Sequence, residues 1–164
     1  MTPELHCPLA ADRIGPAGLE ITVEATSGEC AALARRMGLP AIESLSCEFH
    51  LDRDLAHRLV GHGHLRARIV QTCVVSLEDF SAGVDEQFTV LFIPAGNESD
   101  NDDPEALDEI PFEDGIIDLG EATAQQLALA LDPYPRAPGA ELPENASDPE
   151  EHQFATLAAL KRLQ

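Results

Sequence analysis

The chain has 164 residues, with thirty acidic against ten basic side chains and a formal net charge of −20. Binding to nucleic acid or to anionic lipid rests on a positive field, so this charge excludes a protein that coats either with its whole surface. A hydrophobic fraction of 44% excludes a wholly disordered chain, and the length suits one domain. With no Trp and one Tyr, the stacking aromatic side chains that recognise RNA bases are poorly supplied.

The sequence predicts a cytoplasmic protein without a membrane span. Met1 to Ala11 lacks the apolar run of a secretory signal. The longest clean apolar run, Leu127–Leu131, is far shorter than the roughly 20 residues that a span needs. The cysteines are widely spaced with no C-x-x-C pair, which predicts free thiols, most of them buried, rather than a disulfide framework or a zinc ribbon. They are Cys7, Cys30, Cys47 and Cys73.

Two strands and a helix are predicted before residue 40. Leu5–Leu9 and Leu19–Ala25 alternate apolar and polar residues, as antiparallel strands with one solvated face do. Thr26 and Glu29 form a capping box that predicts a helix over 27–37.

The central part predicts long strands. The alternation returns at Leu45–Leu51 and continues over 64–75, with a hairpin connection expected between them in residues 53–63. Residues 87–93 are apolar on both faces at their end, which indicates a central strand or one that a helix covers. Two glycines beside the hairpin are expected to mark a bulge or an irregular strand entry, namely Gly61 and Gly63.

Most of the negative charge lies in the C-terminal part. Residues 95–164 have a net charge of −14, against −6 for residues 1–94. We expect a flexible acidic loop over 95–110, a helix over 119–131, and a proline-rich arm over 132–147. Asp148, followed by Pro149, predicts the start of a third helix.

These elements predict an α+β fold. The expected core is an antiparallel sheet of about five or six strands, with the helices at 27–37 and 119–131 packed against it. Periodicity leaves open whether the sheet closes into a barrel-like form. A C-terminal helix follows the proline-rich arm, and residues 1–164 are expected to make a single domain.

Arginines supply most of the positive charge, and some of them are candidate phosphate contacts. Arg66 and Arg68 are predicted to share one strand face, which makes this pair the best candidate. Arg35 and Arg36 would join them if the fold brought the helix beside that strand. Scattered surface arginines are the alternative.

The acidic run that begins after Gly96 is a candidate contact for a basic partner. From Glu98 to Glu121 the chain has eleven acidic residues and no basic one. A solvated loop is the alternative, and the glycine and terminal Glu of a calcium loop are absent. The candidate side chains are Asp100, Asp102, Asp103, Glu105, Asp108 and Glu109.

Histidines and one cysteine suggest a different class, a metal- or thiol-dependent enzyme. His62 and His64 would lie on one strand face, with His50 and His57 nearby, but no carboxylate or cysteine is spaced to complete a metal site. Cys73 alternates with apolar residues, which predicts a buried and inert thiol. We therefore expect neither a catalytic residue nor a bound metal or cofactor.

Several segments together resemble the YceD family, which is named for accumulation of large-subunit ribosomal RNA. Leu65–Cys73 with Leu77–Phe80 is similar to its central strand and turn, and Val84–Phe88 to its next strand. Further segments resemble its strand-to-helix segment, the helix with the proline-rich stretch that follows, and its C-terminal signature. These segments are Gly115–Leu119, Gln126–Pro135 and Phe154–Lys161, and the motif positions are Cys73, Asp118, Tyr134 and Phe154.

The resemblance implies a bacterial, cytoplasmic, non-enzymatic factor in ribosomal RNA accumulation or large-subunit assembly. Its partner would be ribosomal RNA or a basic large-subunit ribosomal protein, and neither a membrane nor DNA. An acidic interaction domain unrelated to ribosomes is the remaining alternative. Many members carry C-x-x-C at the central turn, whereas Val74, Val75 and Ser76 follow Cys73 here, so no metal site is carried over.

Overall fold

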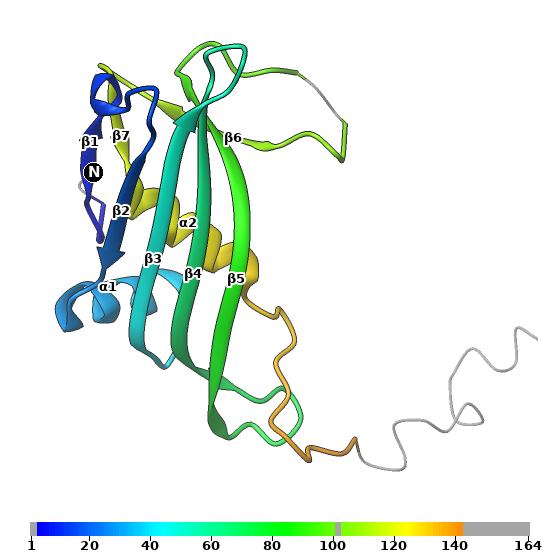
Figure 1. The fold of residues 1–164 in the computed structure, drawn as a ribbon. Coiled ribbons are helices and arrows are strands. Elements are labelled where there is room, and N and C mark those ends of the chain that lie inside the picture. The colour runs from blue at the N-terminus through cyan, green and yellow to red at the C-terminus, as the bar shows by residue number, and fades with distance from the viewer. Residues whose placement is uncertain (1–2, 101–102, 143–164) are drawn as a thin grey trace, which may run out of the picture.

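The computed structural model describes residues 3–100 and 103–142 and has an α+β fold (Figure 1). A five-stranded sheet has the order β2-β3-β4-β5-β6, and β1 pairs with β7 in a small second sheet. Helix α2 crosses behind the large sheet in Figure 1, whereas α1 packs against β3. The elements are β1 Pro8–Ala10, a 3-10 turn Ala11–Arg13, β2 Leu19–Glu24, α1 Ser27–Met37, β3 Ala41–Arg53, β4 Leu59–Thr72, β5 Asp79–Pro94, β6 Asp108–Phe112, β7 Ile116–Asp118 and α2 Leu119–Ala130.

The two predicted helices that lie within the described residues are confirmed. The Thr26 hydroxyl accepts the N–H of Glu29 while the Glu29 carboxylate accepts the N–H of Thr26, so the capping box of α1 is complete. Gly38 ends α1 in the left-handed conformation, at φ 67°. Asp118 caps α2 by accepting the N–H groups of Gly120 and Glu121. The third helix, expected from Asp148, lies outside the described residues.

Most of the strands expected from alternation are present, but of Leu5–Leu9 only Pro8 and Leu9 lie in a strand, β1, which belongs to the small sheet. The large sheet is mixed rather than antiparallel. The pairs β2–β3, β3–β4 and β4–β5 are antiparallel. The pair β5–β6 is parallel, which corrects the expectation of a wholly antiparallel sheet. The acidic loop lets the chain cross back before β6 begins, so β6 runs in the same direction as β5. The sheet is open, with β2 at one edge and β6 at the other.

Gly61 and Gly63 lie within β4 at regular register, so the expectation of a bulge there is wrong. The register shift of this sheet lies instead in β3, between Ile42 and Ser44. A Cβ on Gly61 would come within 2.7 Å of the Phe92 ring, and one on Gly63 within 2.1 Å of the Phe88 ring. The glycines therefore make room for two phenylalanine rings of the neighbouring strand.

The core lies between the large sheet and the helices. Leu45, Phe49 and Leu65 of the sheet pack there with Leu33 of α1 and Leu127 of α2. The opposite face of the sheet carries mostly polar side chains, because alternate residues of each strand point there. None of the described helices is long and apolar enough to cross a membrane.

Candidate interaction surfaces

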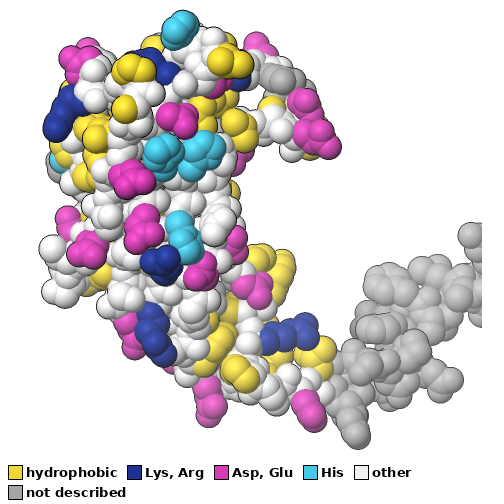
Figure 2. Space-filling model, viewed as in Figure 1, with side chains coloured by type: hydrophobic (Ala, Val, Ile, Leu, Met, Phe, Trp, Pro, Cys, Tyr) yellow, Lys and Arg dark blue, Asp and Glu magenta, His cyan; other side chains and the backbone are white. Residues whose placement is uncertain are grey.

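The outer face of the sheet, which the helices leave uncovered, carries a column of histidine and arginine side chains along β4. His62, His64, Arg66 and Arg68 follow one another at alternate positions. Figure 2 shows this face, with histidine and arginine side chains interspersed among acidic ones. The predicted shared face of Arg66 and Arg68 is therefore confirmed.

Carboxylates of β3 lie beside both arginines. Arg66 is 3.6 Å from Glu48, and Arg68 is 3.3 Å from Glu43. A hollow of about 350 Å³ lies beside the two arginines, lined also by hydroxyl groups and a glycine. The pair could contact a phosphate there, but in competition with the two neighbouring carboxylates.

The other two candidate arginines lie elsewhere, on α1. Arg36 reaches Glu121 of α2 at 2.7 Å and Glu4 of the N-terminal segment at 3.0 Å. Hydrogen bonds to Glu121 raise the pKa of Arg36 above its usual value. Arg35 is exposed on the same helix. The arrangement of Arg36 ties three segments together, so it serves the fold, and the four arginines do not form one patch.

Three of the four candidate histidines lie together on the outer face. The rings of His50 and His62 stack at a centroid distance of 6.4 Å, and His64 lies 2.7 Å from Asp85. His57 is separate, in the turn between β3 and β4. Within residues 3–100 and 103–142, no group of three potential ligands has the geometry of a metal site.

The acidic candidates divide between the loop and β6. Asp100, Asp103 and Glu105 are exposed in the loop, whereas Asp108 and Glu109 belong to β6, so the loop ends before residue 110. Hydrogen bonds from the backbone N–H and hydroxyl of Ser99 lower the pKa of Glu109. Asp102 lies outside the described residues. Figure 2 shows acidic side chains at the far end of this projecting segment.

Cys73 is buried, but its surroundings are polar. β4 ends at Thr72, so Cys73 begins the turn to β5. The backbone N–H of Ser76 donates to the Cys73 sulfur at 3.4 Å. Hydrogen bonds from the Ser76 hydroxyl and from the N–H groups of Ser76 and Ala137 lower the pKa of the Cys73 thiol to about 6. The predicted burial of this thiol is confirmed, but its hydrogen-bond partners are polar groups of the turn and the arm rather than an apolar surface.

The proline-rich arm packs against the same turn. The Val74 N–H donates to the Pro135 carbonyl at 2.9 Å, and the Gln71 side chain donates to the Asp132 carbonyl at 3.4 Å. Tyr134 is 73% exposed, so its ring contributes little to this packing. The turn supplies one cysteine thiolate and a serine hydroxyl, a donor set that does not fit a tetrahedral zinc site.

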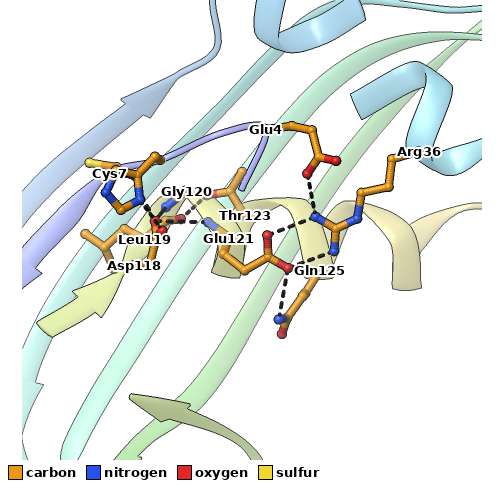
Figure 3. A network of polar contacts seen from close by, with 10 residues as sticks. Glu4, Cys7, Arg36, Asp118, Leu119, Gly120, Glu121, Thr123 and Gln125 are labelled. Atoms are coloured by element: carbon orange, nitrogen blue, oxygen red, sulfur yellow. Dashed lines mark hydrogen bonds and ion pairs between the residues drawn. The ribbon is translucent and has the colours of Figure 1, made fainter. Parts of the chain in front are cut away.

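Asp118 organises the junction between the N-terminal segment and α2 (Figure 3). Besides capping α2, it accepts the N–H of Cys7 at 2.9 Å and contacts His6 Nδ1 at 2.5 Å. Partial burial favours a higher pKa for Asp118, but hydrogen bonds from Cys7 and His6 outweigh it and lower the pKa. Gly120 lets the helix approach closely, since a Cβ there would lie 2.5 Å from the Leu5 carbonyl oxygen. Asp118 thus joins the N-terminal segment to the start of α2.

A model of one protein family matches residues 61–163, described as large ribosomal RNA subunit accumulation protein YceD. This match covers more than half of the chain. The chain belongs to the YceD family. The matched region of this YceD protein starts within β4 and includes β5, β6, α2 and the arm. No curated protein and no solved structure matches the chain.

The family name points to a role in the accumulation of large-subunit ribosomal RNA. Of the family-motif positions, Cys73, Asp118 and Tyr134 are described above, and Phe154 lies outside the described residues. Sequence reasoning missed Ala137 as a partner of Cys73, because the two residues are 64 positions apart in the chain. They meet only because the arm folds back against the turn. It also missed the carboxylates beside Arg66 and Arg68, which the register of β3 places there.

Proposed function

We propose that this YceD protein supports large-subunit ribosomal RNA accumulation by binding a basic ribosomal protein. It would act in the bacterial cytoplasm without catalysing a reaction. The observation that carries the choice of partner is the pairing of Arg66, Arg68 and Arg36 with carboxylates of the same chain. Since these pairs cancel the local positive charge, the long-range field stays negative and attracts a basic partner.

The acidic loop and β6 supply the complementary charge. Asp100, Glu105 and Asp108 are exposed, and no basic residue interrupts the sequence from Glu98 to Glu121. Exposed acids on a projecting segment can meet a basic partner at little desolvation cost, which favours fast association and strong salt dependence.

Direct RNA binding is the second candidate function. It is favoured by the hollow beside Arg66 and Arg68, where Ser44, Ser46 and Ser81 add hydroxyl donors. A phosphate there would have to displace Glu43 and Glu48 from the two arginines. We therefore rank direct RNA binding below the binding of a basic protein.

A retention experiment with matched charge variants separates the two. The immobilised protein is exposed to purified ribosomal RNA and to a mixture of basic large-subunit ribosomal proteins at about 50–150 mM salt. We expect retention of a basic protein, loss of that retention in Asp100→Asn/Glu105→Gln/Asp108→Asn, and no loss in Arg66→Gln/Arg68→Gln.

The opposite pattern would favour RNA as the partner. In that case the arginine variant would lose RNA, and the acidic variant would keep it. Retention of neither component would overturn both mechanisms. In a deletion strain, normal levels of precursor and mature ribosomal RNA would overturn the proposed role itself.

A further inference from the structure

Part of β5 is an uncovered sheet edge. β6 pairs with β5 only over Val90–Pro94. Among the described residues, no strand lies along the remaining part, and Figure 1 shows only the end of α2 and the arm passing it on the side away from β4. Unpaired strand edges accept further strands readily, so natural proteins cover or interrupt them unless they are used.

The backbone of this edge is turned outward at alternate residues. The N–H of Cys73 donates to the carbonyl of Glu78, and the β4–β5 register then continues without a shift to Leu59 and Phe92. In an antiparallel pair every second residue pair is hydrogen-bonded, so the intervening residues of β5 point their backbone groups away from β4. These are Asp79, Ser81, Gly83, Asp85 and Gln87, and none of their backbone groups bonds to any other described residue.

Apolar side chains lie beneath the same edge. Ala82, Val84 and Phe88 face the core but are only half-buried, whereas Ala67 and Ile69 on β4 are buried. A hollow of about 250 Å³ separates this part of β5 from the end of α2 and the arm. A second hollow of about 290 Å³ lies between Phe88 and Leu129, which is 71% exposed.

The charge of the edge is negative. Glu78, Asp79, Asp85 and Glu86 lie on or beside it, and no basic residue occurs between Glu78 and Phe88. Arg136 is the one cationic side chain that lines the hollows beneath the edge. The edge thus presents Asp79 and Asp85 on the outer side, backbone groups along it, and apolar groups beneath, with Glu86 beside them.

We propose that the β5 edge, Asp79–Gln87, binds an extended basic polypeptide segment as an added strand. Basic side chains at alternate positions of that segment would face Asp79 and Asp85. The apolar side chains between them would enter the two hollows beneath the edge. A second copy of this chain fits poorly, because pairing two such edges would bring like charges together. The inference rests on the proposed function, and it adds a second contact for the basic partner besides the acidic loop and β6.

The first experiment uses a terminally blocked peptide of about ten residues that alternates lysine and valine. Binding to the full chain is followed by fluorescence anisotropy. N-methylation of alternate residues removes the hydrogen-bond donors along one edge of the peptide and leaves the other edge intact. We expect one N-methylated set to weaken binding by about tenfold or more, while the other set retains it.

The second experiment compares two edges of the sheet. Asp79→Asn/Asp85→Asn removes two charges at β5, and Glu20→Gln/Glu24→Gln removes two from the opposite edge strand, β2. We expect the β5 variant to weaken both peptide binding and retention of a basic ribosomal protein, and the β2 variant to leave both unchanged. Far-ultraviolet circular dichroism checks that both variants are folded.

Four results would overturn the inference: no peptide binding, equal binding of both N-methylated peptides, a dimer formed through this edge, or displacement of the peptide by single-stranded oligouridylate. If a basic ribosomal protein is retained equally by the wild type and the β5 variant, the inference fails and the proposed function stands. If the peptide binds at the edge but no ribosomal protein is retained, the proposed function fails and the edge site stands.

Discussion

β5 is one continuous strand with two differently covered halves. β6 pairs with its C-terminal half, the covered half, and no described strand lies beside its N-terminal half, the open half, on the side away from β4. Val90 and Phe92, where β6 pairs, are 0% and 2% exposed. Val84 and Phe88, which precede the part of β5 that pairs with β6, are only half-buried although they face the same core. β5 pairs along the whole length of β4, whereas β6 pairs only with Val90–Pro94. One strand can thus serve the fold at one end and offer an interface at the other.

The largest expected effect comes from removing the two rings. Phe92→Ala leaves a cavity in the covered half and is expected to cost about 3–5 kcal/mol of unfolding free energy. Phe88→Ala, in the open half, should cost no more than about half of that, because its ring is less buried. Urea unfolding at constant pH measures both, and equal losses would contradict the difference between the halves.

The glycines opposite these rings give a second and smaller contrast. Gly61→Ala places a methyl group 2.7 Å from Phe92, whose buried ring has little room to move. Gly63→Ala places a methyl group 2.1 Å from Phe88, whose ring can move toward the hollow beside Leu129. We expect Gly61→Ala to cost about 1–3 kcal/mol and Gly63→Ala less, despite its closer approach. A larger loss for Gly63→Ala would show that the open half is as tightly packed as the covered half.

The turn that begins the open half predicts a pH dependence. Because hydrogen bonds lower the pKa of Cys73 to about 6 in the folded chain, the ionised thiol stabilises the fold above the ordinary thiol pKa. This stabilisation is lost as the pH falls through about 6. The difference in melting temperature between wild type and Cys73→Ser should therefore grow from about pH 5 to about pH 9.

A matched control removes a thiol that lacks these partners. Burial raises the pKa of Cys30, so Cys30→Ser should show no such growth over the same pH range. A constant difference for Cys73→Ser would contradict the assignment of a thiolate at the turn.

The smallest expected effect concerns the outer face beside the open half. Arg68 and Glu43 have side chains that are 70% and 45% exposed, and exposed ion pairs contribute little. We expect Arg68→Gln to change the unfolding free energy by less than about 0.5 kcal/mol. A much larger loss in urea unfolding would show that this face stabilises the fold and is not a surface left for partners.

Local signals in the sequence predicted the helices and most of the strands. The capping box at Thr26 and the cap at Asp118 act within three residues, so their effect can be read directly. The same holds for alternation, which placed Arg66 and Arg68 on one face because neighbouring side chains in a strand point to opposite sides. For the candidate sites, the sequence supplied the residue types but not their neighbours in space, such as the carboxylates that offset the charge of Arg66 and Arg68.

From the sequence alone one can read the acidic charge, the caps, the strand periodicity and the resemblance that the family match confirms. The folded chain adds the parallel direction of β6, the tight glycine contacts, the carboxylates beside the arginines and the polar surroundings of Cys73. The difference is one of range, since caps and periodicity act between residues a few positions apart. Register, strand order and edge exposure depend on segments far apart in the chain, which meet only when the sheet assembles.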